Sequence, residues 1–156
     1  YLLHFRNNNN LSGIYFPIDA VFYNDKGKMI NQDSLFKNKI TIIDVWVSSC
    51  GTCIKGFPVF NDLAIKYQKD KNIQFAVLNV PLIRDNKERV VSYTEKFDFI
   101  KLYSNYKCDS ILNLKVYPQY LIVGKDKKIH YIGSLHVDKN LFYNNFDNIL
   151  KKIKND

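Results

Sequence analysis

Two cysteines separated by two residues, Cys50 and Cys53, are the side chains in this sequence best suited to chemistry. A pair at this spacing can bind a metal ion, form a structural disulfide, or exchange electrons by alternating between dithiol and disulfide. A zinc site needs two further ligands, typically a second pair of cysteines or histidines. The sequence offers only one further cysteine, Cys108, and three single histidines, His4, His130 and His136, with no paired spacing. We therefore expect no metal at this pair and interpret it as redox-active.

The elements around the pair predict how it would work. Residues 40–47, ITIIDVWV, are nearly continuous in apolar side chains, which is typical of a strand covered on both faces. Residues 53–70 carry apolar side chains at helical spacing, with Pro58 near the start. Cys50 would therefore lie at a helix N-terminus, whose N–H groups and dipole stabilise a thiolate. Cys53, one turn further along, could resolve a mixed disulfide formed by Cys50.

The remaining pattern predicts an α/β fold. A second buried strand at 73–80 would complete a strand–helix–strand unit, in which the two strands are parallel. Residues 20–30 are expected to form an N-terminal β-hairpin extension. Residues 119–132 are expected to form a second hairpin, and residues 138–154 a closing helix with one apolar face.

Length and composition indicate one globular domain. The chain has 156 residues, of which 46% are hydrophobic and 24% charged. We expect residues 1–13, which include an asparagine run, to be a loose leader, and residues 14–156 to form the domain. No apolar run is long enough to cross a membrane.

The net charge of +8 comes mainly from lysine, and asparagine, isoleucine and tyrosine are also abundant. We interpret this as the composition bias of an AT-rich genome, because a nucleic-acid surface more often clusters arginine with aromatic residues. The two lysine-rich segments, GKDKKI and KKIKND, are expected to be solvated ends. The charge leaves acidic partners and anionic membrane surfaces open.

The residues around the cysteines, VWVSSCGTCIKGFP, resemble the active-site segment of thioredoxin-fold proteins. Trp46 precedes Cys50 by four residues, Asp44 precedes it by six, and Pro58 follows Cys53 by five, as in that family. The stretch VYPQYLIVGKDKKIHYIG is similar to the family's cis-proline strand and following hairpin. The stretch FPIDAVFYNDKGKMINQDSLFKNKITIIDVWV resembles the start of the TlpA/ResA-like branch, whose members are usually extracytoplasmic, membrane-tethered thiol-disulfide oxidoreductases.

The resemblance implies a thioredoxin-like fold, with a central mixed β-sheet flanked by helices and an N-terminal β-hairpin extension, and a role for each residue of the motif. Cys50 would be the nucleophile and Cys53 the resolving thiol. Asp44 would manage the proton of the resolving thiol, because burial in an apolar strand raises the pKa of a carboxylate toward neutrality. Pro118 is expected to be cis, so that the backbone of Tyr117 could pair with an extended substrate segment.

Neighbouring residues are expected to shape the site. Trp46 would pack beneath it, and Gly51 and Thr52, which lie between the cysteines, would face the substrate and tune the redox potential. The chain departs from the branch at Ser49, where tryptophan is usual, at Thr52, where proline is frequent, and at Gly56, where glutamate is often found. The branch's usual substrate, apocytochrome c, is therefore not carried over to this chain.

The function predicted on this basis is reduction of disulfides in protein substrates, without an organic cofactor or metal. A redox partner must recycle the pair, and a membrane-bound electron donor is one candidate. Two alternatives stay open: a disulfide oxidase or isomerase using the same site, because direction depends on potential, and a thioredoxin-like chaperone holding copper or zinc on the pair. The leader, the absence of an initial methionine and the resemblance favour an extracytoplasmic location, in the periplasm or cell envelope. Cys108 is interpreted as an incidental buried thiol.

Overall fold

The computed structural model describes residues 13–105, 108–134 and 139–155. Its centre is a seven-stranded mixed sheet with the strand order β2-β1-β5-β4-β3-β6-β7. The strands are β1 (Phe22–Tyr23), β2 (Met29–Ile30), β3 (Ile40–Trp46), β4 (Ile73–Asn79), β5 (Ile100–Ser104), β6 (Gln119–Val123) and β7 (Ile129–Gly133). The helices are α1 (Gln32–Phe36), α2 (Gly51–Lys66), α3 (Lys87–Ser92), α4 (Cys108–Ile111) and α5 (Lys139–Asn155).

The centre of the sheet is the strand–helix–strand unit that the sequence predicts. Every residue of β3 is buried. Strand β3 pairs in parallel with β4, beginning at Ile40 opposite Ile73, and α2 connects the two strands. On its other side β3 pairs with β6 in antiparallel register, with Val45 opposite Gln119. Because β3 is paired on both edges and covered on both faces, the segment that follows it is held in a fixed place.

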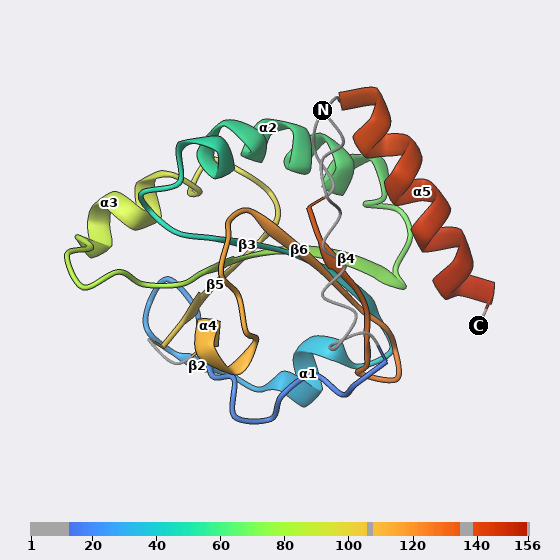
Figure 1. Ribbon diagram of the computed structural model, residues 1–156, viewed down its shortest axis with the longest axis horizontal. Coiled ribbons are helices and arrows are strands. Elements are labelled where there is room, and N and C mark those ends of the chain that lie inside the picture. Colours follow the sequence, from blue (N-terminus) through green and yellow to red (C-terminus); the bar gives the residue numbers. More distant parts are fainter. Residues whose placement is uncertain (1–12, 106–107, 135–138, 156) are drawn as a thin grey trace.

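Helices cover both faces of the sheet, so the protein has two cores (Figure 1). Helices α2, α3 and α5 cover one face, where alternate β3 residues such as Ile42 and Trp46 pack against Phe57 and Phe60 of α2. Helices α1 and α4 cover the other face, where the core contains these side chains: Phe36 of α1, Ile43 and Val45 of β3, and Leu112.

The expected architecture is confirmed in its main features. The N-terminal hairpin is present as β1 and β2, although each strand has only two residues. It joins the sheet at β5, where Phe22 lies opposite Ser104. The second hairpin and the closing helix are present as β6, β7 and α5. The expected leader, residues 1–13, lies outside the described residues except for its last position. Within the described part of the chain, no helix is both long enough and apolar enough to traverse a bilayer.

Candidate redox site

Cys50 and Cys53 lie at the N-terminus of α2 and are joined by a disulfide bond. The backbone N–H of Cys50 donates to the carbonyl of Val47 at 3.0 Å, which closes a turn directly after β3. Cys50 is then the N-cap residue of the 16-residue helix, and its sulfur accepts a hydrogen bond from the N–H of Cys53 at 3.2 Å. The turn therefore delivers the Cys50 sulfur to the positive end of a helix dipole.

The two sulfurs differ in accessibility. Cys53 is buried, with 1% of its surface exposed, and packs in the core beneath α2. Cys50 is only partly buried and contacts the edges of both cores. An incoming thiolate or disulfide would therefore meet Cys50 first, which is the order that an attacking and a resolving thiol require.

The two residues between the cysteines form an open surface. Gly51 and Thr52 are exposed, and a Cβ atom added to Gly51 would meet nothing within 4 Å. The hydroxyl of Thr52 lies 3.4 Å from the sulfur of Cys50. Neither residue carries a charge, so the helix N-terminus is the main stabilising element of this turn for a Cys50 thiolate.

Asp44 lies in the middle of β3 with its side chain fully buried. It shares a face of the strand with Ile42 and Trp46, and this face packs under α2, where Cys53 is also buried. Among the described residues neither carboxylate oxygen has a hydrogen-bond partner. Burial therefore raises the pKa of the Asp44 carboxyl well above its ordinary value.

Trp46 lies in the core and not on the surface of the site. It is fully buried, and its ring packs edge-on against Phe57 at 5.1 Å and against Tyr93 at 6.1 Å between ring centroids. Its contribution to the site is therefore to support the N-terminal half of α2 from below.

Tyr117 and Pro118 lie directly before β6, the strand that pairs with β3. The peptide bond between them is cis, Pro118 is buried, and Tyr117 is partly buried against the same two cores as Cys50. Because Gln119 pairs with Val45, continuing this register brings Tyr117 alongside the end of β3. The structure thus brings these two residues to the edge that carries the cysteines.

A contact that sequence reasoning missed joins the site to the loop after β4. The hydroxyl of Ser48, two residues before Cys50, donates a hydrogen bond to the carboxylate of Asp85. The other oxygen of Asp85 accepts from the N–H of Leu82 at 2.7 Å. The same loop carries Ile83, which is 92% exposed. Ser48 and Asp85 are 37 residues apart, and no local spacing or motif links them in sequence.

The third cysteine is remote from this chemistry. Cys108 is buried at the start of α4, within the core on the opposite face of the sheet from Cys53. Among the described residues, no group of three or more histidine, cysteine, aspartate or glutamate side chains could hold a metal ion.

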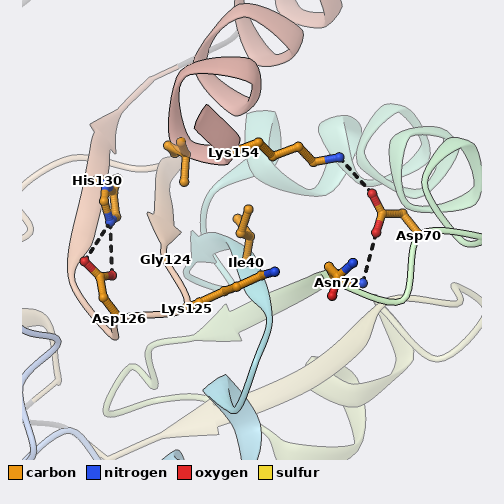
Figure 2. Close-up of a pocket in the computed structure, with 9 residues that line it drawn as sticks. Ile40, Asp70, Asn72, Gly124, Lys125, Asp126, His130 and Lys154 are labelled. Atoms are coloured by element: carbon orange, nitrogen blue, oxygen red, sulfur yellow. Dashed lines mark hydrogen bonds and ion pairs between the residues drawn. The ribbon is translucent and has the colours of Figure 1, made fainter. Parts of the chain in front are cut away.

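A cavity among the described residues lies at the other end of the sheet (Figure 2). It has a volume of about 490 Å³ and borders Ile40, the first residue of β3. Two polar contacts flank it: the ion pair of Lys154 with Asp70 at 2.8 Å, and the hydrogen bond between His130 and Asp126 at 3.0 Å. No cysteine lines it, and the length of β3 separates it from Cys50 by roughly 20 Å.

Comparison with known proteins supports the architecture. No protein-family model matches the sequence, and neither does any curated protein. A protein of Chlorobium tepidum assigned as the thiol:disulfide interchange protein DsbE is similar in structure, with a TM-score of 0.72 and 16% identity over 91% of this chain and 96% of that one. The fold is thioredoxin-like.

Two further structures share this fold. A thiol:disulfide interchange protein from a Bacteroides species has a TM-score of 0.68 and 17% identity, covering 92% of this chain and 90% of its own. MTB DsbF, solved in mixed oxidized and reduced forms, has a TM-score of 0.65 and 15% identity, covering 83% and 93%. The thioredoxin-like fold expected from VWVSSCGTCIKGFP is thus confirmed, and the roles of the individual site residues stay predictions.

Proposed function

We propose that this protein is a thiol-disulfide oxidoreductase that reduces disulfides in protein substrates. The observation that carries the proposal is the pairing of a partly exposed Cys50 at a helix N-terminus with a buried Cys53. Similar structures include proteins named as thiol:disulfide interchange proteins, which supports the same reaction class.

The reaction begins when the Cys50 thiolate attacks one sulfur of a substrate disulfide. A bond forms between Cys50 and that sulfur, and the other substrate sulfur leaves as a thiolate that takes up a proton. The N-terminus of α2 stabilises the attacking thiolate, and the exposed surface at Gly51 and Thr52 leaves room for the substrate.

The second step resolves the mixed disulfide. Cys53 loses its proton and attacks the Cys50 sulfur, so that the Cys50–Cys53 disulfide forms and the second substrate sulfur leaves as a thiolate. Asp44 is proposed to accept the proton from Cys53 and to return it in the next cycle. Its buried position suits this exchange, because burial raises the pKa of the Asp44 carboxyl and so helps it to hold the proton taken from Cys53. The two electrons gained by the substrate come from the dithiol.

One charge beside the nucleophile, the carboxylate of Asp85, favours the reducing direction. The residues between the cysteines are uncharged, and the carboxylate of Asp85 contacts Ser48 beside the nucleophile. A negative charge near Cys50 disfavours the thiolate and hence the reduced form, which lowers the reduction potential and makes the dithiol a stronger reductant.

The reaction requires a recycling partner, and the resemblance suggests a location. A dithiol donor must reduce the Cys50–Cys53 disulfide after each turnover, and a membrane-bound donor is one form that it could take. We place the protein outside the cytoplasm, as the resemblance of its N-terminal hairpin and active-site segment to the TlpA/ResA-like branch suggests. Tyr117 would offer its backbone to an extended substrate segment, as in strand addition.

Reduction of a protein disulfide tests the proposal directly. Reduced protein should convert a disulfide-bonded protein such as insulin to its thiol form, with one disulfide lost for each Cys50–Cys53 disulfide formed. Oxidation of reduced substrate proteins in a glutathione buffer, without reduction of insulin, would assign the oxidase or isomerase direction instead.

A further inference from the structure

Two lysine-rich segments that the sequence indicates are solvated ends lie side by side in the structure. The turn between β6 and β7, residues 124–128, and the end of α5 both line the cavity at the start of β3. Lys154 of α5 reaches Asp70 in the link between α2 and β4, and Lys125 extends between this pair and the pair formed by His130 (Figure 2).

Two more lysine-containing segments reach the same end of the sheet. Strands β3 and β4 are parallel and begin in register, so the links that precede them lie next to each other. The N–H of Ile40 donates to the carbonyl of Asn72 at 2.7 Å across these links. Together these segments form a surface, here called the basic pole, whose lysines are Lys37, Lys39, Lys69, Lys71, Lys125, Lys127, Lys128, Lys151, Lys152 and Lys154.

Among the described residues, the carboxylates in these segments are fewer, and each contacts a basic side chain: Asp33 contacts Lys127, Asp70 contacts Lys154, and Asp126 contacts His130. Asp147, near Lys151 in α5, pairs with Lys66. The basic pole therefore has a large net positive charge. Around Cys50, by contrast, charges of both signs alternate along the loop after β4 and the start of α3: Arg84, Asp85, Lys87, Glu88 and Arg89. A composition bias alone would enrich lysine at both ends of the molecule.

Exposed apolar side chains border the basic pole. Residues 13–16 run along the β6–β7 turn, and the N–H of Phe16 donates to the carbonyl of Lys127 at 2.7 Å. In this segment and just beyond it, Ile14 is 41% exposed, Tyr15 67% and Ile18 88%. The ammonium group of Lys128 lies 5.3 Å from the centre of the Tyr15 ring. Lysine beside exposed tyrosine and isoleucine is the combination that peripheral proteins use at a membrane interface.

We propose that the basic pole, together with the apolar side chains of residues 14–18, binds the surface of an anionic lipid membrane. Lysine presents a point charge that suits scattered lipid phosphates, and the basic pole contains no arginine among the described residues, although arginine is preferred where phosphates and bases of nucleic acid are recognised. Bound in this way, the protein would carry Cys50 at the end farthest from the lipid, facing soluble partners.

Flotation with lipid vesicles tests the proposal. The full chain should float with vesicles of phosphatidylcholine and phosphatidylglycerol, and not with phosphatidylcholine alone, and high salt should release it. A pole variant, Lys71→Glu, Lys125→Glu and Lys152→Glu, should bind at least tenfold more weakly, because each lysine near an anionic surface contributes about fivefold. A control variant, Lys26→Glu, Lys28→Glu and Lys87→Glu, makes the same change in net charge on exposed residues away from the pole and should bind like wild type.

A second variant distinguishes binding to lipid from binding to other polyanions. Tyr15→Ser with Ile18→Ser should weaken vesicle binding and leave binding to heparin unchanged, because only lipid has an apolar interior. Equal loss of vesicle binding in the pole and control variants would overturn the proposal, as would tighter binding to single-stranded DNA than to anionic vesicles at the same salt. These assays do not depend on thiol chemistry, so their failure would leave the proposed redox function untouched.

Discussion

Replacing Asp44 by asparagine tests the buried carboxyl in two independent ways. The first is thermodynamic. Burial raises the pKa of Asp44 in the folded protein above its value near 4 in the unfolded chain, so the folded state binds a proton more tightly. Asp44 therefore favours folding most at low pH, and stability falls as pH rises from about 4 to the folded pKa, by at most about 1.4 kcal/mol per pH unit. Asp44→Asn should remove this contribution to the slope.

The second effect is kinetic. If Asp44 accepts the proton of Cys53, the asparagine variant should resolve the mixed disulfide more slowly, on the order of 100-fold near neutral pH. Formation of the mixed disulfide at Cys50 should stay close to the wild-type rate, because Asp44 is fully buried and Cys50 is the accessible sulfur.

Both effects can be measured on the same pair of proteins. Urea unfolding of the oxidised proteins at several pH values gives the stability slope, and stopped-flow reaction of the reduced proteins with a disulfide substrate gives the two rates. A wild-type slope equal to that of Asp44→Asn would refute the raised pKa. An unchanged rate of resolution would refute the proton-transfer role and leave Asp44 as a core carboxyl.

Three further predictions concern other residues of the site. Cys53→Ser should leave Cys50 trapped in a mixed disulfide with substrate, visible on a non-reducing gel, and prompt release would contradict the assigned order. Asp85→Asn should lower the pKa of the Cys50 thiol by about half a pH unit, measured as the pH dependence of its alkylation rate. Ser48→Ala keeps the Asp85 charge and should change the Cys50 pKa less. Equal changes in the two variants would show that the hydrogen bond alone matters. Phe57→Ala should lower the free energy of unfolding, measured in urea, by about 3–5 kcal/mol, because the ring is fully buried against Trp46. A loss of stability below about 1 kcal/mol would contradict this packing.

The central part of the fold could be predicted because its pattern is local and strong. The run of apolar side chains in β3, followed by a helical period after Cys53, permits few arrangements other than parallel strands joined by a helix. The cysteine spacing then places one sulfur at the N-cap and the other one turn inside the helix. The burial of Asp44 could be predicted from the same run of residues, because Thr41 is the only other polar residue in it.

Features that depend on contacts distant in the sequence could not be predicted. The hydrogen bond between Ser48 and Asp85 requires the loop after β4 to fold back over the end of β3. No residue pattern predicts this loop conformation. The basic pole is a similar case, because its lysines come from four separate links and ends that meet only when the sheet forms. The ring contacts of Trp46 with Phe57 and Tyr93 likewise join residues distant in sequence, although its packing beneath the site was expected.

The reduction potential of the Cys50–Cys53 pair tests the central claim most directly. The protein would be equilibrated in defined dithiol buffers and followed by Trp46 fluorescence and by thiol alkylation. The account predicts a reversible two-electron couple below about −230 mV, in the range of reductases. A value above about −180 mV would contradict the reducing direction, and the absence of any reversible couple would contradict disulfide exchange itself.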